Sequence, residues 1–440
     1  MSAEGRGPSP TFEELAEQLH DLLAPSLAVD WPNLPVTRAS GPYVWGTDGR
    51  RYLDFVSGMA TTNIGHGHPR VVAAARGQME KLIHGPVGVL LYEPLLRLAH
   101  ELRQVMPGGL DMFFFCNSGA EAVEGSLKLA RYVSGRPAII AFEGGFHGRT
   151  MGVASVTTSK SRYRLHYEPL LPAVYFVPFP YCYRCPFCGE PDSCRLECLG
   201  RFQALFAHQV DPSQVAAVLM EPVQGEGGYI VPPARYLTGL RELCNRHGIL
   251  LVFDEVQTGF GRTGAMFAAQ ALGVRPDIMA VAKAIASGFP LGVTAAPAPL
   301  MKKWSPGSHG TTFGGNPVAC AAALATLAVL REEELPARAG RLGHTTLARL
   351  RELKERHPQV GDVRGLGLMI GVEFVVPENR EPDGELATRV LEEALREGLI
   401  LYPCGNRNHV IRFIPPLNVP EEELARGIDI FCRAVEVACR

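Results

Sequence analysis

The residues best placed for chemistry are Asp254, Glu255 and Lys283, because each stands where an apolar, strand-like run stops. Such a run indicates a strand buried on both faces, and parallel strands deliver their C-terminal residues to the sheet edge where ligands bind. A lysine buried at that edge is unfavourable unless it is paired or used chemically. Burial favours the neutral amine, which attacks carbonyl carbons. The ordinary alternative for Lys283 is a snorkelling side chain with its ammonium group in water.

A phosphate site is predicted at Asn117-Ser118-Gly119, where a strand passes into a helix. Free N–H groups at a helix start, a hydroxyl beside them and a glycine that permits close approach together suit an anion. The alternative is that Ser118 only caps the helix and Gly119 fills a tight turn. The loop Ser308–Pro317 is also rich in glycine and hydroxyl groups, so it is either a second phosphate donor or a plain loop.

Two further segments carry side chains that suit a binding site. In FEGGFHGRT, Phe146 or His147 could stack on a flat ring, and Arg149 could hold a carboxylate by a bidentate pair. The alternatives are a core aromatic residue and a surface ion pair. In MEPVQGEGG, Glu221 follows a strand end and Glu226 lies in the loop beyond it, as site carboxylates or as solvated loop charges.

These segments converge on one ligand chemistry. The predicted sheet edge gathers a phosphate cradle, an aromatic ring, a carboxylate and an amine, and a phosphorylated pyridine aldehyde would use all four. Lys283 would bond to the aldehyde. Asp254 would keep the ring nitrogen protonated, so that the ring withdraws electrons. Ser118 and the neighbouring N–H groups would hold the phosphate.

The elements that position these residues alternate between strand and helix. That alternation is typical of an open, mostly parallel α/β sheet. The predicted strands are Met112–Cys116, Ala138–Phe142, Ala216–Met220, Ile249–Asp254, Ile278–Ala282 and Gly292–Ala296, and the predicted helices are Glu121–Tyr132, Pro233–His247 and Pro317–Arg331.

The pattern changes on both sides of this alternating part. An Asp48-Gly49 turn predicts an N-terminal hairpin, and the C-terminal part predicts a smaller α+β domain. We therefore expect three parts: residues 1–58 as an arm and hairpin that pack with the small domain, residues 59–331 as the large domain with a cysteine-rich insert at 180–200, and residues 332–440 as the small domain.

Bulk properties narrow the class of protein. The chain has 440 residues, with 43 basic and 45 acidic side chains, and this balance argues against a nucleic-acid partner or an anionic membrane surface. Val318–Leu330 is the longest apolar stretch and is too short to span a bilayer. The N-terminal sequence lacks a secretory pattern and the 11 cysteines are odd in number, so we expect a reduced, cytoplasmic setting.

The motifs, taken in order, resemble one family. NSGAEA, FHGRT, EPVQGEGG, FDEVQTGFGRTG, a lysine 29 residues after Asp254, and TTFGGNP occur here as in the class III, pyridoxal-phosphate-dependent aminotransferases of fold type I. The resemblance runs from about Tyr43 to Val435 and is greatest to 4-aminobutyrate aminotransferases. It implies an α/β large domain with a mostly parallel central sheet, plus a smaller α+β domain.

The resemblance also implies a role for individual residues of the cofactor site. Lys283 would be the Schiff-base lysine and the proton carrier, and Asp254 the partner of the ring nitrogen. Thr312 would reach the phosphate of the neighbouring subunit, which implies a homodimer with shared sites or a dimer of such dimers. The remaining cofactor-binding residues would be Ser118, Gly119, Ala120, Phe146, His147, Glu221, Val256 and Gln257.

The resemblance assigns the substrate site to Met59, Arg149, Glu226 and Arg412. Arg149 would bind the distal carboxylate and Arg412 the α-carboxylate of glutamate, while Glu226 would pair with Arg412 when a substrate has no α-carboxylate. The implied reaction moves an amino group from an ω-amino acid resembling 4-aminobutyrate to 2-oxoglutarate with ping-pong kinetics.

Three other functions stay open from the sequence. Arg149 also suits acetylornithine and ornithine aminotransferases. Racemases or epimerases with nearly the same cofactor site need only return the proton to the opposite face of the same carbon. An idle protein that binds pyridoxal phosphate or a metal is the non-enzymatic alternative, although it would be expected to lack Lys283 or Asp254, and both are present.

A cysteine cluster lies apart from these motifs. Its C-x2-C and C-x3-C spacing matches a tetrahedral zinc site. The alternatives are free thiols, disulfides or an iron–sulfur cluster. The favoured zinc ligands are Cys182, Cys185, Cys194 and Cys198, with Cys188 spare.

Overall fold

The computed structural model describes residues 11–27, 33–187 and 194–440. Its largest element is a seven-stranded sheet in the order β4-β10-β9-β8-β7-β5-β6. The strands in that order are Met112–Cys116, Gly292–Ala296, Ile278–Val281, Leu250–Asp254, Val215–Met220, Ala138–Phe142 and Val174–Val177. Only β10 runs antiparallel to its neighbours, so the predicted mostly parallel α/β sheet is confirmed.

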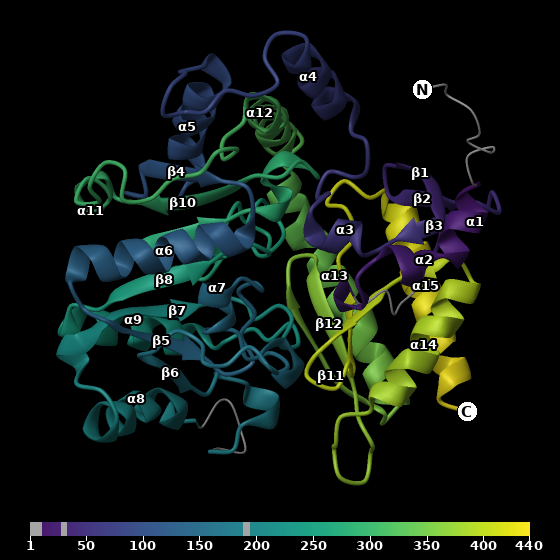
Figure 1. Ribbon diagram of the computed structural model, residues 1–440. Coiled ribbons are helices and arrows are strands. Elements are labelled where there is room, and N and C mark those ends of the chain that lie inside the picture. The colour runs from purple at the N-terminus through teal and green to yellow at the C-terminus, as the bar shows by residue number, and fades with distance from the viewer. Residues whose placement is uncertain (1–10, 28–32, 188–193) are drawn as a thin grey trace.

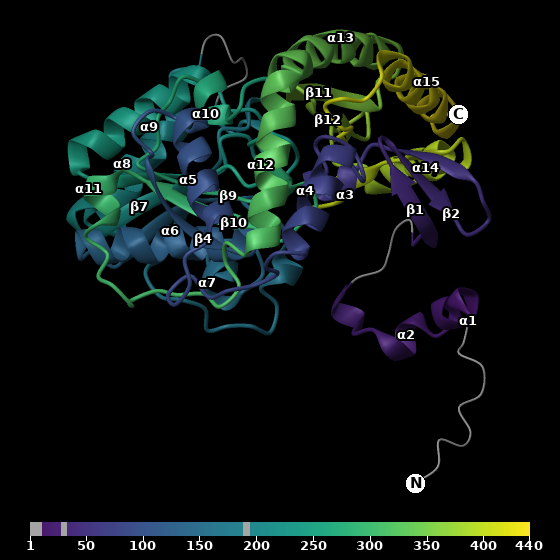
Figure 2. The ribbon, with the colours of Figure 1, turned by 90° about the horizontal axis from the view of Figure 1, so that it is seen from above.

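Helices cover both faces of this sheet. Figure 2 shows α6 (Gly119–Ser134) and α9 (Ala234–His247) on opposite faces, and α12 (Pro317–Glu332) between the large sheet and the C-terminal part. The apolar stretch Val318–Leu330 therefore forms a buried helix, as expected. None of the helices among the described residues combines the length and apolar character needed to cross a bilayer.

Two smaller sheets form the other side of the molecule (Figure 1). One has the order β1-β2-β3-β13 and joins the predicted hairpin to the C-terminal part, because β13 pairs in parallel with β3. The other is antiparallel, in the order β11-β12-β15-β14. Their strands are Val36–Ser40, Tyr43–Gly46, Arg51–Asp54 and Leu399–Ile400, then Val360–Leu366, Met369–Phe374, Val410–Phe413 and Tyr402–Cys404.

Three helices pack on these small sheets, and the other helices lie elsewhere. The three are α13 (Leu335–Arg356), α14 (Gly384–Arg396) and α15 (Glu421–Ala438). In Figure 2, α1 (Phe12–Glu17) and α2 (Leu19–Leu22) lie apart from the main body. The others are α3 (Ser57–Ala60), α4 (Pro69–Met79), α5 (Glu93–Val105), α7 (Met151–Ala154), α8 (Glu197–His208), α10 (Ala268–Ala271) and α11 (Ala298–Met301).

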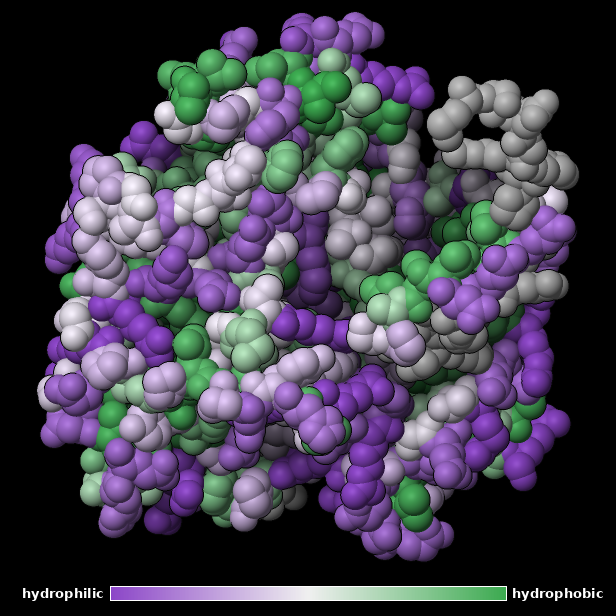
Figure 3. All heavy atoms as spheres, in the orientation of Figure 1, coloured by the Kyte–Doolittle hydropathy of each residue, from purple (hydrophilic) through white to green (hydrophobic). Residues whose placement is uncertain are grey.

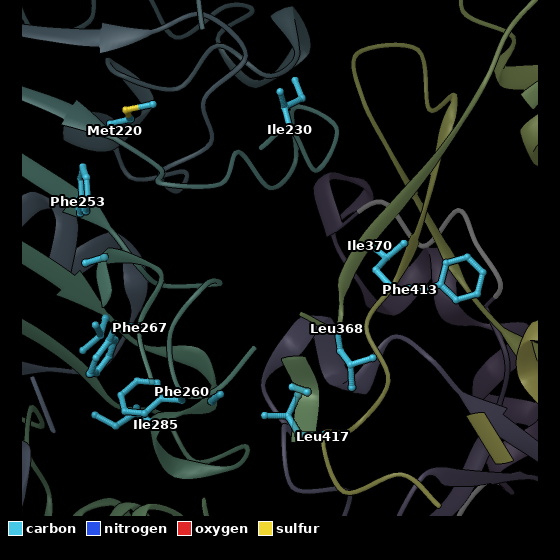
Figure 4. Packing of buried hydrophobic residues seen from close by; sticks show 14 of the residues in the cluster. Met220, Ile230, Phe253, Phe260, Phe267, Ile285, Leu368, Ile370, Phe413 and Leu417 are labelled. Carbon is cyan, nitrogen blue, oxygen red and sulfur yellow. The ribbon is translucent and has the colours of Figure 1, made fainter. Parts of the chain in front are cut away.

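One apolar core runs through both parts of the molecule. Figure 4 shows Met220 and Phe253 from the large sheet in the same cluster as Ile370 and Phe413 from the small one, with Leu417 between these parts. All five side chains are buried. Because the core is continuous, side chains from both parts can be held at fixed positions around a shared cavity.

The predicted elements agree closely with those in the structure. The expected strands and helices occur within about two residues of their predicted ends, as is usual for element boundaries. The sequence analysis missed β6, a short strand at the sheet edge. The three-part division stays a proposal: residues 59–331 supply every strand of the large sheet, whereas residues 36–54 and 332–440 supply the two small sheets.

Candidate functional site

The carboxyl ends of the parallel strands meet at one cavity of about 350 Å³, a size suited to a small-molecule ligand. Asp254 ends β8, Glu221 follows β7 and Lys283 follows β9. Thirteen of the fifteen residues predicted for the cofactor and substrate line this cavity: Met59, Gly119, Ala120, Phe146, His147, Arg149, Glu221, Glu226, Asp254, Val256, Gln257, Lys283 and Arg412.

Asp254 is a buried carboxylate held from two sides. Its Oδ2 lies 2.7 Å from Nδ1 of His147, and its Oδ1 accepts the N–H of Val256 at 3.0 Å. Burial lowers the pKa of His147, but the hydrogen bond and charge of Asp254 and the charge of Glu221 outweigh that effect and raise it. His147 therefore positions the carboxylate, a role that differs from the ring stacking considered from the sequence.

The neighbouring carboxylate of Glu255 has a different task. It accepts the O–H of Thr258 at 2.6 Å and the N–H groups of Ala268 and Ala269 at 2.8 and 2.6 Å, and it does not line the cavity. Burial raises its pKa to about 7. Of the two carboxylates at the end of β8, only Asp254 faces the site.

Glu221 fixes the loops on either side of the cavity. Its Oε2 accepts the N–H of Phe146 and its Oε1 that of Gly225, each at 3.0 Å. Burial raises the pKa of Glu221, and the charge of Asp254 raises it further. The structure thus gives Glu221 a positioning role for the aromatic residue beside it.

Lys283 has the environment of a reactive amine. Burial lowers its pKa, and its side chain lines the same cavity as Asp254. The residue adopts φ of +47°, a left-handed value that is unusual for a side chain with a Cβ. Backbone strain of this kind concentrates at functional sites.

The cavity side chains fit pyridoxal phosphate. Gln257 has a buried amide oxygen with no partner among the described residues, so it can meet a ring hydroxyl. A Cβ at Gly119 would lie 2.7 Å from Cγ1 of Val256, which explains why only glycine fits between the helix start and the valine. Phe146 packs edge-on against Tyr163, with ring centroids 5.6 Å apart.

Two predicted residues lie outside the cavity lining. Ser118 caps α6, because its Oγ accepts the N–H of Glu121 at 3.2 Å, so the capping alternative describes this structure. Gly119 and Ala120 stand at that helix start and do line the cavity. Thr312 is exposed on the loop before α12, as a residue that serves another subunit must be. The phosphate roles of Ser118 and Thr312 stay predictions.

The substrate end contains one paired and one unpaired arginine. Nη2 of Arg412 donates to Oε2 of Glu226 at 2.9 Å, and both side chains are buried or nearly so. Burial raises the pKa of Glu226, but the charges of Arg412 and Lys160 outweigh it, so the pKa is lowered. Arg149 has no carboxylate partner in the described residues and lies 4.6 Å from the ring centroid of Tyr163.

Several residues at the site were missed from the sequence, and three of them contact the predicted side chains Arg149, Arg412 or Glu226. Tyr163 and Tyr402 line the cavity, and the guanidinium of Arg412 lies 5.1 Å from the Tyr402 ring. Lys160 lies behind Glu226 and contacts it at 2.9 Å. No motif or spacing singles out these residues, because their partners are distant in the chain.

The cysteine cluster is separate from this cavity. Cys182, Cys185, Cys194 and Cys198 line one small cavity of their own, and burial raises the pKa of Cys198 to about 11. No three His, Cys, Asp or Glu side chains within the described ranges are arranged to hold a metal ion. Cys188 lies outside those ranges. The zinc site therefore stays a prediction.

Comparison with known proteins identifies the family. The model for aminotransferase class III matches residues 26–435. The chain belongs to this class. An enzyme of this class is a pyridoxal-phosphate-dependent aminotransferase, so the family, the enzymatic activity and the cofactor predicted from the sequence are confirmed.

Individual relatives match this class III aminotransferase over almost its whole length. The 5-aminovalerate aminotransferase DavT of Pseudomonas aeruginosa is 40% identical over 401 residues, 91% of this chain and 92% of that protein. The 4-aminobutyrate aminotransferase GabT of Escherichia coli is 39% identical over 403 residues, 91% and 93% respectively. A thermostable (S)-enantioselective omega-transaminase from Thermomicrobium roseum has a TM-score of 0.87 at 34% identity, covering 98% and 99%.

Proposed function

We propose that this aminotransferase moves the amino group of an ω-amino acid, such as 4-aminobutyrate or 5-aminovalerate, to 2-oxoglutarate. The observation that carries the proposal is the ion pair between Arg412 and Glu226, 2.9 Å apart at the cavity wall. Relatives named for these two donors support it. Racemisation and an ornithine-type donor are not favoured, since the relatives at 39–40% identity are named for 4-aminobutyrate or 5-aminovalerate.

The ion pair lets one cavity accept two kinds of substrate. An ω-amino acid has a single carboxylate, which Arg149 binds while Glu226 neutralises Arg412. Glutamate and 2-oxoglutarate bring a second carboxylate, which takes Glu226's place on Arg412. An arginine left unpaired in a closed site would be unfavourable, so exchange of its carboxylate partner permits both substrates.

The remaining residues carry the chemistry. Pyridoxal phosphate, when bound, supplies an electron sink for the carbon that loses a proton. The Asp254 carboxylate, oriented by His147, holds a proton at the ring nitrogen. The Lys283 amine, which lines the cavity, would serve as the base that takes the proton from the donor carbon and as the acid that gives it back. Val256 and Phe146 would hold the ring, and Gln257 would bond its hydroxyl.

We also propose a homodimer in which Thr312 completes the phosphate site of the neighbouring subunit. An apolar surface on and after α4 and α5 supports this, because exposed patches of this kind mark interfaces. Figure 3 shows hydrophobic side chains gathered in that region. The exposed apolar residues there are Met79, Ile83, Val89, Leu90, Leu91, Leu96 and Phe313. A cytoplasmic setting belongs to the same proposal, in keeping with the free thiols of the buried residues Cys116, Cys244 and Cys320.

A panel of amino donors with 2-oxoglutarate tests the function. We expect glutamate to form from 4-aminobutyrate and 5-aminovalerate faster than from ornithine or acetylornithine. A chiral assay of single amino acids, run beside the panel, measures racemisation. Inversion of a single amino acid without any need for 2-oxoglutarate would overturn the proposal.

A further inference from the structure

Lys160 is a buried lysine that contacts the substrate site from behind. It lies in the loop after α7, with its side chain 9% exposed. Its Nζ donates to Oε1 of Glu226 at 2.9 Å and to Oδ1 of Asn408 at 2.7 Å. A lysine is rarely buried unless its charge is paired, so this ammonium group is placed for Glu226.

The two oxygens of Glu226 are shared between two cations. Oε1 faces Lys160 and Oε2 faces Arg412, each at 2.9 Å. Arg412 is also held without Glu226, because its Nη2 donates to the carbonyl oxygen of Pro403 at 2.8 Å. Oε2 of Glu226 can therefore lose Arg412 while Oε1 keeps its hydrogen bond from Lys160.

Lys160 itself stays out of the substrate's reach. Glu226 and Arg412 line the substrate cavity, whereas Lys160 and Asn408 line a separate open cavity on the other side of Glu226. The carbonyl oxygen of Glu226 also accepts the N–H of Gly405, which ties its loop to the one that carries Asn408. Lys160 is thus placed to act on Glu226 and not on the substrate.

The charges explain why a second cation is useful. With an ω-amino acid bound, Glu226 neutralises Arg412. With an α-carboxylate on Arg412, Glu226 is displaced and would be a buried carboxylate without a cation, which is strongly unfavourable. Because Lys160 holds Glu226, that carboxylate keeps a cation whether an ω-amino acid or glutamate is bound, and Arg412 is free to pair with the α-carboxylate of glutamate.

We infer that Lys160 is a positioning residue that sets the dual specificity of the site: it retains Glu226 when an α-carboxylate displaces that side chain from Arg412. This inference rests on the proposed function. It predicts that Lys160 favours the glutamate and 2-oxoglutarate half-reaction specifically. A lysine that only stabilised the fold would affect both half-reactions alike.

The test measures the two half-reactions of the holoenzyme separately, from the visible absorbance of the cofactor. In Lys160→Met we expect the KM for glutamate to rise about 30-fold or more, as for a buried charge that loses its partner. The KM for 4-aminobutyrate should change less than about threefold, and kcat should change little for either donor. Lys160→Arg, which keeps the charge, should restore glutamate binding.

Two further variants separate this role from general effects. Arg162→Met removes a cation from the same open cavity without touching Glu226, so both KM values should stay near wild type. In Glu226→Ala/Lys160→Met the lysine change should add nothing to the glutamate KM of Glu226→Ala, because no carboxylate remains to be held.

The outcomes distinguish this inference from the proposed function. If the wild-type enzyme does not use 4-aminobutyrate with 2-oxoglutarate, the proposed function fails and the inference with it. If the wild type uses both substrates but Lys160→Met weakens both equally, only the inference fails. Cofactor content and Tm are measured for every variant. A higher glutamate KM in Glu226→Ala/Lys160→Met than in Glu226→Ala would also overturn the inference.

Discussion

The carboxylate of Asp254 should control proton removal without being needed to hold the cofactor. Asp254→Asn keeps the size of the side chain. It also leaves an oxygen that can accept the N–H of Val256, which donates to Oδ1 of Asp254 at 3.0 Å in the wild-type protein. It removes the negative charge that, in the proposed mechanism, holds a proton at the ring nitrogen. The ring then withdraws electrons poorly, so the donor carbon should lose its proton slowly.

The expected loss of rate in Asp254→Asn follows from the interaction between the buried Asp254 carboxylate and a protonated ring nitrogen. Two unit charges about 4 Å apart interact by about 4 kcal/mol at an effective dielectric constant of about 20. His147 on the other side of Asp254 adds a charge-assisted hydrogen bond of 2.7 Å that the amide weakens. Since about 1.4 kcal/mol corresponds to a tenfold change in rate, we expect the half-reaction to slow by roughly a thousandfold.

Single-turnover kinetics with 4-aminobutyrate measure this loss directly, because the visible band of the bound cofactor changes as the half-reaction proceeds. Cofactor content is measured on the same sample and should stay near one per chain. Glu255→Gln is the matched control: it is the adjacent buried carboxylate, but it bonds Ala268 and Ala269 instead of facing the cavity. It should lower Tm while leaving the rate near wild type.

Near-normal turnover in Asp254→Asn would refute the assignment of Asp254 to the ring nitrogen. Loss of the cofactor from this variant would show instead that the carboxylate is needed for binding. A rate loss in Glu255→Gln as large as that in Asp254→Asn would show that both changes act through the fold at the end of β8.

Three further outcomes are expected. Glu226→Ala should slow the 4-aminobutyrate half-reaction more than the glutamate one, because it leaves an arginine unpaired only with the first donor; equal losses would contradict this. Glu373→Gln should lower the free energy of unfolding at pH 7 by about 1.5–3 kcal/mol, because it removes one of the two carboxylates that pair with buried Arg364, while Asp362 stays 2.9 Å from that arginine. Burial raises the pKa of Glu373, but the hydrogen bond of His409 and the charge of Arg364 outweigh it and lower the pKa. The stabilisation is therefore complete above about pH 4.3, the ordinary value of the unfolded chain, and is lost as the pH falls through the lower folded value. Denaturant titrations at pH 7 and pH 3 should show that the free energies of unfolding of Glu373→Gln and wild type differ less at pH 3. The same difference at both pH values would contradict this prediction. Metal analysis checks the cysteine cavity: the zinc hypothesis expects about one zinc per chain, absent in Cys185→Ser, and a metal-free wild type would refute it.

The motifs along the chain were enough to predict the family and the central sheet. Alternating apolar runs and helix signals predict the strand ends, and parallel strands bring those ends to one edge wherever they lie in the sequence. This is why the positions of Asp254, Glu221 and Lys283 at strand ends were enough to expect them at one site. The missed strand β6 is short and partly exposed, so its sequence pattern is weak.

Individual side-chain roles at that edge depended on the tertiary structure. Asp254 and Glu255 are adjacent and chemically alike, and only their hydrogen bonds separate the site carboxylate from the structural one. His147 was expected to contact the ring, yet it lies 2.7 Å from Asp254, a partner 107 residues away. Its role depends on how two strand ends approach each other, which no local pattern records.

The sequence by itself determined the chemistry of this protein, because residue type and strand register decide which groups reach the sheet edge. Tertiary structure decided how charge is distributed at the substrate end. Lys160, Glu226, Asn408 and Arg412 come from separate loops and strands, and the distances between them follow from packing of the two parts on a shared core. Long-range ion pairs have no sequence signature, since their strength depends on burial and on the path of the intervening chain.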